Sequence, residues 1–202
     1  MLHIQPEALT ERENYKLLIG SIIPRPIAFT TTISEDGVVN AAPFSFFNIV
    51  SSNPPMLSVS IQRKNGVMKD TARNAKANKQ FVIHIVDTSN VEEINKTAAN
   101  LPADESEIDT TSLTLVDSTV VNVPAVAESK VRFECELVQA LELGDGDAVG
   151  CDLLIGRIVA YHIAEDIYEE GKIDPDKLAA VSRLAGNDYA TIGDIFTIER
   201  PL

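Results

Sequence analysis

Alternation of apolar and polar side chains predicts strands along much of the chain. In residues 57–61 and 131–137 every second side chain is apolar, and those between are polar or charged. A period of two gives a strand one apolar face, so each segment is predicted to form a strand. Residues 81–86 are apolar apart from His84, a pattern typical of a central strand.

Turn signals join two further pairs of strands. Residues 27–33 contain three threonines and lead into Glu-Asp-Gly at 35–37, which predicts a hairpin whose return strand covers 38–42. Residues 143–147 contain two Gly-Asp steps. They predict a turn from the preceding strand into a long strand over 151–163.

Helices are fewer, and capping residues mark where they begin. Helices are predicted over 70–78, 89–100 and 174–184. The first begins at an aspartate cap, the second at the serine of a Ser-x-x-Glu capping box, and the third at an aspartate followed by proline. A weaker pattern predicts an early helix over 6–17.

The order of these elements indicates the fold class. Strands that follow one another along the chain argue against alternating βαβ units and favour an antiparallel barrel with helices packed outside it. The expected fold is therefore mainly β with flanking helices. Residues 1–202 are expected to form a single domain, with the polar stretch 102–111 as a surface excursion.

Charge and composition exclude several kinds of partner. The chain has 17 Lys and Arg against 30 Asp and Glu, a net charge of −13, so no nucleic-acid partner is expected. No apolar run approaches the roughly 18 residues of a membrane span, and the N-terminus lacks the pattern of a secretory signal. A cytoplasmic protein with no membrane partner is expected.

Few side chains suggest catalysis or metal binding. The three histidines are too scattered for a triad or a metal site, so no catalytic side chain and no metal are predicted. His84 is more simply a satisfied core or surface group. Cys135 and Cys151 lie in separate apolar segments, which argues against a disulfide scaffold or zinc site. Both are expected to be structural and reduced.

Two segments near the N-terminus carry candidate chemistry. Arg25 lies between Pro24 and Pro26, which hold the backbone extended and fix the direction of the arginine. A stiff entry into the next strand is the alternative. Pro43 is expected to break the return strand, and the loop after it offers backbone N–H groups, hydroxyls and aromatic walls. Such a loop suits a flat ligand with polar edges, or is simply a buried turn.

Two later segments carry further candidates. Lys69, Asp70 and Thr71 begin a predicted helix, where free N–H groups form an anion site on which Arg63 could converge. An ordinary helix cap is the alternative. The segment 183–189 follows the last predicted helix, with Gly186 as its C′ residue, and reads equally as a terminal cap with a solvated arginine.

Taken together, these segments resemble the flavin reductase-like, FMN-binding split-barrel family, which includes flavoredoxins and reductase components of nitrilotriacetate monooxygenase. The resemblance covers about residues 15–200 and is carried by SIIPRPIAFTTTISEDGVVNAAPFSFFNIVSSNPP, KDTARN, ESKVRFECEL and RLAGNDYA. It implies a six-stranded, Greek-key-type barrel that works as a homodimer, with FMN near the subunit interface.

The resemblance also implies a set of cofactor-binding residues by matching position. The isoalloxazine edge is expected along Thr30, Thr31 and Thr32. The ring and ribityl chain are expected against Ser45, Phe46, Phe47 and Asn48. The phosphate or chain is expected near Ser51, Arg63, Lys69 and Thr71, and the flavin or nicotinamide side near Arg183 and Tyr189. The predicted set is completed by Arg25, Asn40 and Asp70.

The activity that the resemblance implies is electron transfer from NADH or NADPH to FMN, held tightly or used as a substrate. Reduced flavin would then pass to a partner monooxygenase, to ferric chelates or to oxygen. Flavin chemistry needs orientation more than a side-chain acid or base, which agrees with the missing catalytic constellations. Two alternatives are a flavoredoxin-like electron carrier without nicotinamide turnover and a non-catalytic binding module.

Overall fold

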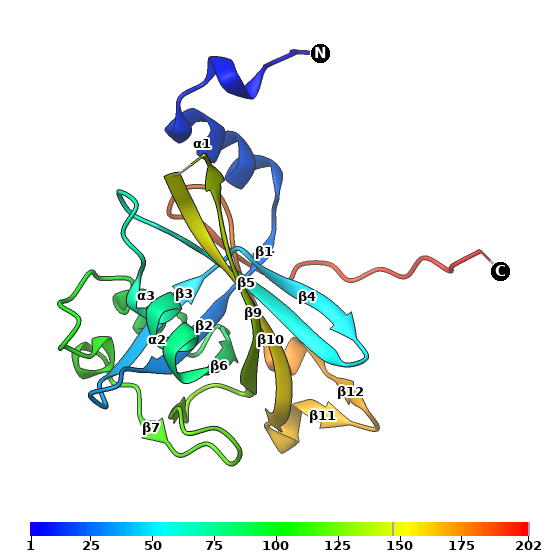
Figure 1. The fold of residues 1–202 in the computed structure, drawn as a ribbon. Coiled ribbons are helices and arrows are strands. Elements are labelled where there is room, and N and C mark those ends of the chain that lie inside the picture. Colours follow the sequence, from blue (N-terminus) through cyan, green and yellow to red (C-terminus); the bar gives the residue numbers. More distant parts are fainter. Residues whose placement is uncertain (147, 202) are drawn as a thin grey trace.

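The computed structural model describes residues 1–146 and 148–201 and is built around one antiparallel sheet of seven strands (Figure 1). Across the sheet the strands are β3 (Val39–Phe44), β2 (Ala28–Ile33), β6 (Gln80–Ile85), β9 (Val131–Asp145), β10 (Ala148–Ile163), β5 (Pro55–Gln62) and β4 (Phe47–Ser52). The edge strands β3 and β4 do not pair with each other, so the barrel is split. The sheet has seven strands where six were expected.

Shorter elements surround the sheet. The helices are α1 (Glu11–Ser21), α2 (Asp70–Asn78), α3 (Val91–Lys96) and α4 (Pro175–Leu178), with 3-10 turns η1 (Pro6–Ala8), η2 (Glu107–Thr110) and η3 (Glu165–Ile167). A three-stranded sheet joins β1 (Arg25–Pro26), β13 (Val181–Arg183) and β14 (Tyr189–Thr191). Two-stranded sheets join β7 (Leu115–Val116) to β8 (Ala125–Val126) and β11 (Tyr168–Glu169) to β12 (Lys172–Ile173). Within the described residues, no helix combines the length and hydrophobicity needed to span a membrane.

The patterned strands are confirmed. Residues 57–61 lie in β5, 131–137 begin β9, and 80–85 form β6 between β2 and β9. The hairpin over 27–42 is also confirmed. Strands β2 and β3 pair in antiparallel register, and the pair nearest the turn is Ile33 opposite Val39. Gly37 has a φ of +86°, a conformation that a residue without Cβ adopts without strain.

Three strand boundaries differ from the prediction. Pro43 does not end β3 but lies opposite Phe29, because β3 is an edge strand whose outer side needs no N–H donor. The expected loop after it is largely strand, since residues 47–52 form β4 against β5. The turn predicted at 143–147 is shorter, because β9 runs to Asp145 and β10 begins at Ala148. Asp147 lies outside the described residues.

Capping residues located the helix starts only in part. Asp70 is not the cap of α2; Lys69 occupies that position, and the Asp70 carboxylate pairs with Arg73 instead. No capping box starts α3, because the N–H and hydroxyl of Ser89 both donate to the Asp87 carboxylate. That helix ends at Lys96, short of the predicted residue 100. The early helix is confirmed in a shifted form as η1 and α1.

The third predicted helix is mostly wrong. Asp174 does cap α4, accepting hydrogen bonds from the N–H groups of Asp176 and Lys177. The helix nevertheless ends at Leu178, because Ala179 takes a left-handed φ of 52°. The chain then turns into β13, which pairs with β1 and is held by a bond from Val181 N to the Val86 carbonyl.

The core lies on both sides of the sheet. One cluster fills the barrel with side chains of β5, β6 and β10, and α2 adds Ala72 and Ala75 to it. A second cluster joins β2 to α3 and β13 through Phe29, Ile94 and Val181. The first cluster packs α2 against the barrel, and the second packs α3 and β13 against Phe29 of β2 and Ala41 of β3.

Glu134 is the exception to the polar face predicted for β9. Its side chain is fully buried under residues 119–121, whose backbone N–H groups donate to the carboxylate at 2.7–2.9 Å. The Thr119 hydroxyl and His162 Nε2 also contact it, at 2.9 and 2.5 Å. Burial alone would raise the pKa of Glu134, but these hydrogen bonds outweigh it and lower the pKa to about 2.

Candidate functional site

Two hollows meet at Phe44, at the end of β3, and form the candidate site. The first, called the Tyr189 hollow, has a volume of about 220 Å³. The second, called the Lys69 hollow, has a volume of about 430 Å³. The two share Pro43, Phe44 and Ala98 as a common wall, so one elongated ligand could occupy both.

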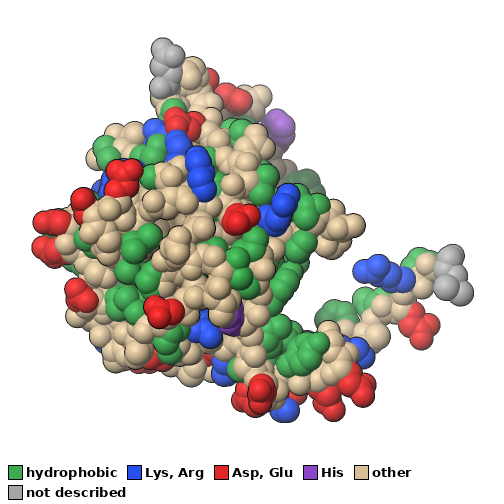
Figure 2. Space-filling model, turned by 60° about the horizontal axis from the view of Figure 1, so that its bottom comes forward, with side chains coloured by type: hydrophobic (Ala, Val, Ile, Leu, Met, Phe, Trp, Pro, Cys, Tyr) green, Lys and Arg blue, Asp and Glu red, His purple; other side chains and the backbone are tan. Residues whose placement is uncertain are grey.

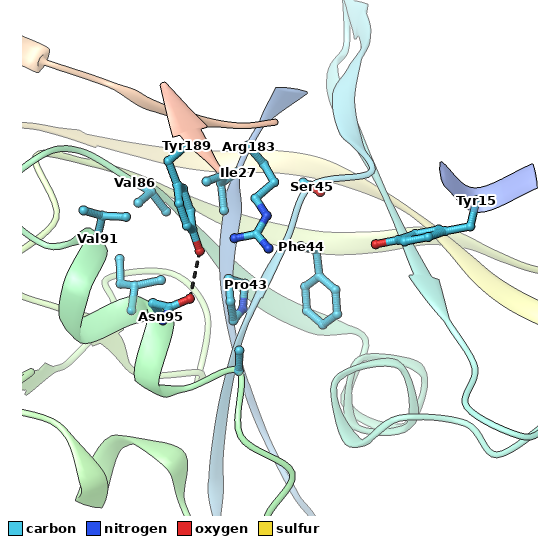
Figure 3. Close-up of a pocket in the computed structure, with 12 residues that line it drawn as sticks. Tyr15, Ile27, Pro43, Phe44, Ser45, Val86, Val91, Asn95, Arg183 and Tyr189 are labelled. Carbon is cyan, nitrogen blue, oxygen red and sulfur yellow. Dashed lines mark hydrogen bonds between the residues drawn. The ribbon is translucent and has the colours of Figure 1, made fainter. Parts of the chain in front are cut away.

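The Tyr189 hollow is closed by a stacked arginine–tyrosine pair. Arg183 and Tyr189 lie opposite each other on β13 and β14, and the guanidinium carbon is 4.4 Å from the centre of the tyrosine ring. Tyr189 donates a hydrogen bond to Asn95 Oδ1 at 2.8 Å, which ties β14 to α3. Figure 3 shows Arg183 pointing into the hollow beside Tyr189, with the rings of Phe44 and Tyr15 across from it.

This pair comes from a hairpin and not from a helix end. Gly186 was predicted as a C′ residue of a helix, but it lies in the turn between β13 and β14 with a φ of +60°. Its carbonyl accepts a bond from Arg183 Nη2 at 2.6 Å. The arginine is therefore anchored and not simply solvated.

The Lys69 hollow combines a cation with a helix start. The Lys69 ammonium lies 5.8 Å from the centre of the Phe44 ring, on the wall that the two hollows share. No side chain caps α2, so the N–H groups of its first turn remain for water or a ligand. A cation beside free helix N–H groups is suited to binding an anion.

Glu107 is a buried residue of this hollow that the sequence did not reveal. It was placed in a surface excursion, but Glu107 and Ile108 are buried in η2. Its carboxylate accepts from Asn40 Nδ2 at 2.9 and 3.0 Å and from Ala41 N at 3.0 Å. Burial raises the pKa of Glu107, against the opposing effect of the Ala41 hydrogen bond.

Through Asn40, Glu107 fixes the polar wall of the hollow. With its amide nitrogen held by Glu107, Asn40 turns its oxygen to the Thr71 hydroxyl, which donates to it at 2.7 Å. Thr32 lies within 3.4 Å of the same oxygen. The predicted residues Asn40, Thr71 and Thr32 are thus brought together by a carboxylate that no motif indicates.

Replacing Glu107 with glutamine is expected to lower the free energy of unfolding by about 1–3 kcal/mol, because an amide N–H would face the donors of Asn40 or Ala41. Urea denaturation of the purified variant measures this loss. The exposed Glu105→Gln is the matched control and should leave stability unchanged. Equal stability of the two variants would contradict the assigned role.

Arg25 acts inside the fold. Its guanidinium donates to the carbonyls of Ile19, Ile22 and Leu184 at 2.6–2.8 Å, and Nε lies 3.5 Å from Ser45 Oγ. The residue therefore ties the end of α1 to the turn after β13. It positions Ser45 at the border of the Tyr189 hollow.

A third, largely apolar hollow of about 400 Å³, called the Leu18 hollow, holds the next predicted residues. It is lined by Leu18 and Ile22 from α1, by Pro24, Arg25 and Pro26, by Ser45, Phe46, Phe47 and Asn48, and by Ser58, Ser60 and Leu153. Ser45 also borders the Tyr189 hollow. Ser51 lies farther along β4, outside the residues that line these three hollows, and accepts a bond from Asn53 N.

Arg63 and Lys69 both line a further hollow of about 680 Å³, whereas Thr30 and Thr31 lie inside the fold. Arg63 is held by Asp152 through two bonds of 2.8 Å and by Glu142 at 3.1 Å, and these carboxylates raise its pKa. Its charge is thus already balanced. The three threonines of β2 are buried, and Thr31 bonds the Pro124 carbonyl while the Thr30 hydroxyl has no partner among the described residues.

Both cysteines are free, and neither lies among the residues that line the three hollows. Cys135 is buried in the barrel core, and burial raises the pKa of its thiol. A buried thiol of raised pKa is a poor nucleophile.

The double variant Cys135→Ala, Cys151→Ala is expected to keep its ligand binding and any redox turnover, at a stability cost of about 1 kcal/mol from the small cavity at position 135. Visible absorbance of the bound cofactor and steady-state rates, beside thermal denaturation, measure both effects. Lost turnover with the cofactor still bound would show that a thiol takes part in electron transfer.

Comparison with known proteins finds similar chains that match along nearly the whole sequence. A family model described as "Flavin reductase like domain" matches residues 19–179. An uncharacterised protein of Bacillus subtilis, YwrF, is 51% identical over 204 residues, across all of both chains. The structure of nitrilotriacetate monooxygenase component B from Bacillus cereus is 53% identical, with a TM-score of 0.96 and 98% of each chain covered. The 2-nitrobenzoate 2-nitroreductase NbaA of Pseudomonas fluorescens is 28% identical, with a TM-score of 0.89, covering 99% of this chain and 96% of that one.

Proposed function

Since this chain belongs to the flavin reductase-like family, a group of flavin-related oxidoreductases, we propose that it binds FMN and reduces it with NADH or NADPH. The observation that carries the proposal is the junction of two hollows at Phe44. One hollow offers a cation and free helix N–H groups, and the other offers stacked aromatic and guanidinium surfaces. FMN has the matching form, a flat ring joined by a chain to a phosphate.

Each end of the site has its own task in this proposal. Lys69 and the first turn of α2 hold the phosphate, with the polar wall of Thr71 and Asn40 beside them. Phe44 provides an apolar wall between the two hollows. Arg183 and Tyr189 close the far side, where the pair excludes water and orients the ring and the incoming nicotinamide. The bound flavin supplies the redox chemistry, because its ring accepts a hydride.

The proposed acceptor of the electrons is a partner monooxygenase. The Bacillus cereus protein, 53% identical to this chain, is named as a component of nitrilotriacetate monooxygenase. A reductase of this kind needs no side-chain acid or base, because reduced flavin itself carries the electrons to the partner. We further propose a homodimer, since Leu18 and Ile22 at the border of the Leu18 hollow are exposed in the single chain.

The test is NAD(P)H oxidation followed at 340 nm, with and without added FMN. Turnover that depends on FMN supports the reductase. A yellow protein that does not oxidise either nicotinamide would instead support a flavoredoxin-like carrier. A colourless protein that binds no flavin and shows no turnover would leave only the binding module.

A further inference from the structure

The end of the described chain forms an arm that stands away from the rest of the molecule. Residues 192–201, here called the C-terminal arm, leave the three-stranded sheet after β14 and run outward (Figure 1). Figure 2 shows the arm projecting from the body, with hydrophobic side chains along it. Within the described residues, no hydrogen bond or ion pair ties the arm to the body.

The composition of the arm is not that of a solvated tail. Ile195, Phe196 and Ile198 are 62%, 79% and 78% exposed, and Ile192 is half exposed. Exposing four large apolar side chains within seven residues to water is energetically unfavourable. Such a cluster marks a surface that another molecular surface covers.

The same side of the chain carries an apolar hollow that is also uncovered. The Leu18 hollow is bordered by Leu18 and Ile22, which are 53% and 60% exposed. Its wall includes β1, which pairs with β13, and β13 pairs with β14, from which the arm leaves. In Figure 1 the arm departs between α1 and β4, the elements that border the hollow, and points away from both.

From this pairing of features we infer that the C-terminal arm lies in the Leu18 hollow of a second copy of the chain. One face then carries both the arm and its receiving surface, which a two-fold axis joins reciprocally.

The inference rests on the proposed flavin-binding dimer and adds a component to its site. The Leu18 hollow shares Ser45 with the Tyr189 hollow, where the flavin is proposed to bind. An arm seated in the Leu18 hollow would therefore lie beside that site. Each subunit would thereby complete the site of its partner with the side chains of Phe196 and Ile198.

The first experiment compares association of flavin-free protein by sedimentation velocity across a concentration series. The double variant Phe196→Asp, Ile198→Asp should dissociate about a hundredfold more easily than the unchanged chain, as loss of a central aromatic anchor does. Thr197→Asp places the same charge at a polar position of the arm and should have a much smaller effect. Association that is unchanged in the double variant would overturn the inference while leaving the dimer intact. An unchanged chain that stays monomeric would overturn both.

The second experiment locates the receiving surface. In a background with Cys135→Ala and Cys151→Ala, one preparation carries Ile22→Cys and another carries Phe196→Cys. Mixing the two under mild oxidation should give a disulfide-linked heterodimer that neither preparation forms alone. A weakened dimer in the first experiment without this cross-link would overturn the Leu18 hollow as the receiving surface. Because neither readout involves flavin, both are independent of the proposed function.

Discussion

Replacing Lys69 with alanine should weaken FMN binding about ten- to a hundredfold and leave riboflavin binding nearly unchanged. The ammonium lies beside Phe44 at the start of α2, where no side chain caps the helix, so it can add its charge to the free N–H groups. A charge-assisted contact of this kind contributes roughly 1.5–3 kcal/mol. Only FMN has the phosphate, so only FMN should lose that contribution.

Fluorescence titration of flavin-free protein with each ligand gives the two dissociation constants. Lys172→Ala, on β12 and outside the residues that line the hollows, is the matched control for loss of one positive charge. An equal loss for FMN and riboflavin would place Lys69 away from the phosphate. Unchanged binding of both would remove it from the site.

Replacing Glu134 with glutamine should lower the free energy of unfolding at neutral pH by about 3 kcal/mol. A fall in pKa from 4.5 to about 2 corresponds to that much differential stabilisation of the charged form. The amide would also bring its own N–H group against a loop whose N–H groups converge on the carboxylate. Urea denaturation measures the loss, and Glu136→Gln, exposed on the same strand, should be nearly neutral.

The same carboxylate gives this loss a definite pH dependence. Because its pKa is lower in the folded chain, its contribution is complete above about pH 4.5 and declines as the pH falls toward 2. The difference in stability between the unchanged chain and Glu134→Gln should therefore shrink over that interval. A difference that stays constant down to the lower limit would show that packing, and not charge, is lost in the variant.

What the sequence predicted well was set by local pattern. The period-two segments became β5 and β9, and the Glu-Asp-Gly turn became the hairpin between β2 and β3. Of the site residues that the resemblance implies, Lys69, Thr71, Arg183 and Tyr189 line the two joined hollows, and their roles there stay predictions.

What the sequence missed depends on segments far apart along the chain. Glu134 and Glu107 look like solvated charges, and only the loops folded over them supply the donors that allow burial. Val181 leaves a helical pattern because it bonds to Val86 and lies in a sheet with β1, both far from it along the chain. The two missed helix caps have a local cause instead, because Ser89 and Asp70 bond to Asp87 and Arg73, two and three residues away.

The short hairpin of β13 and β14 holds Arg183 and Tyr189 at one end and releases the C-terminal arm at the other. In the proposed flavin-binding dimer, ligand occupancy and subunit association would act on this one hairpin, and thermodynamic linkage requires any effect of one on the other to be returned by the same factor. If binding of flavin favours association, the affinity of the chain for flavin would depend on the concentration of the chain. At dilutions where subunits separate, the cofactor should be released, so the amount of protein in a cell would itself regulate how much of it carries flavin.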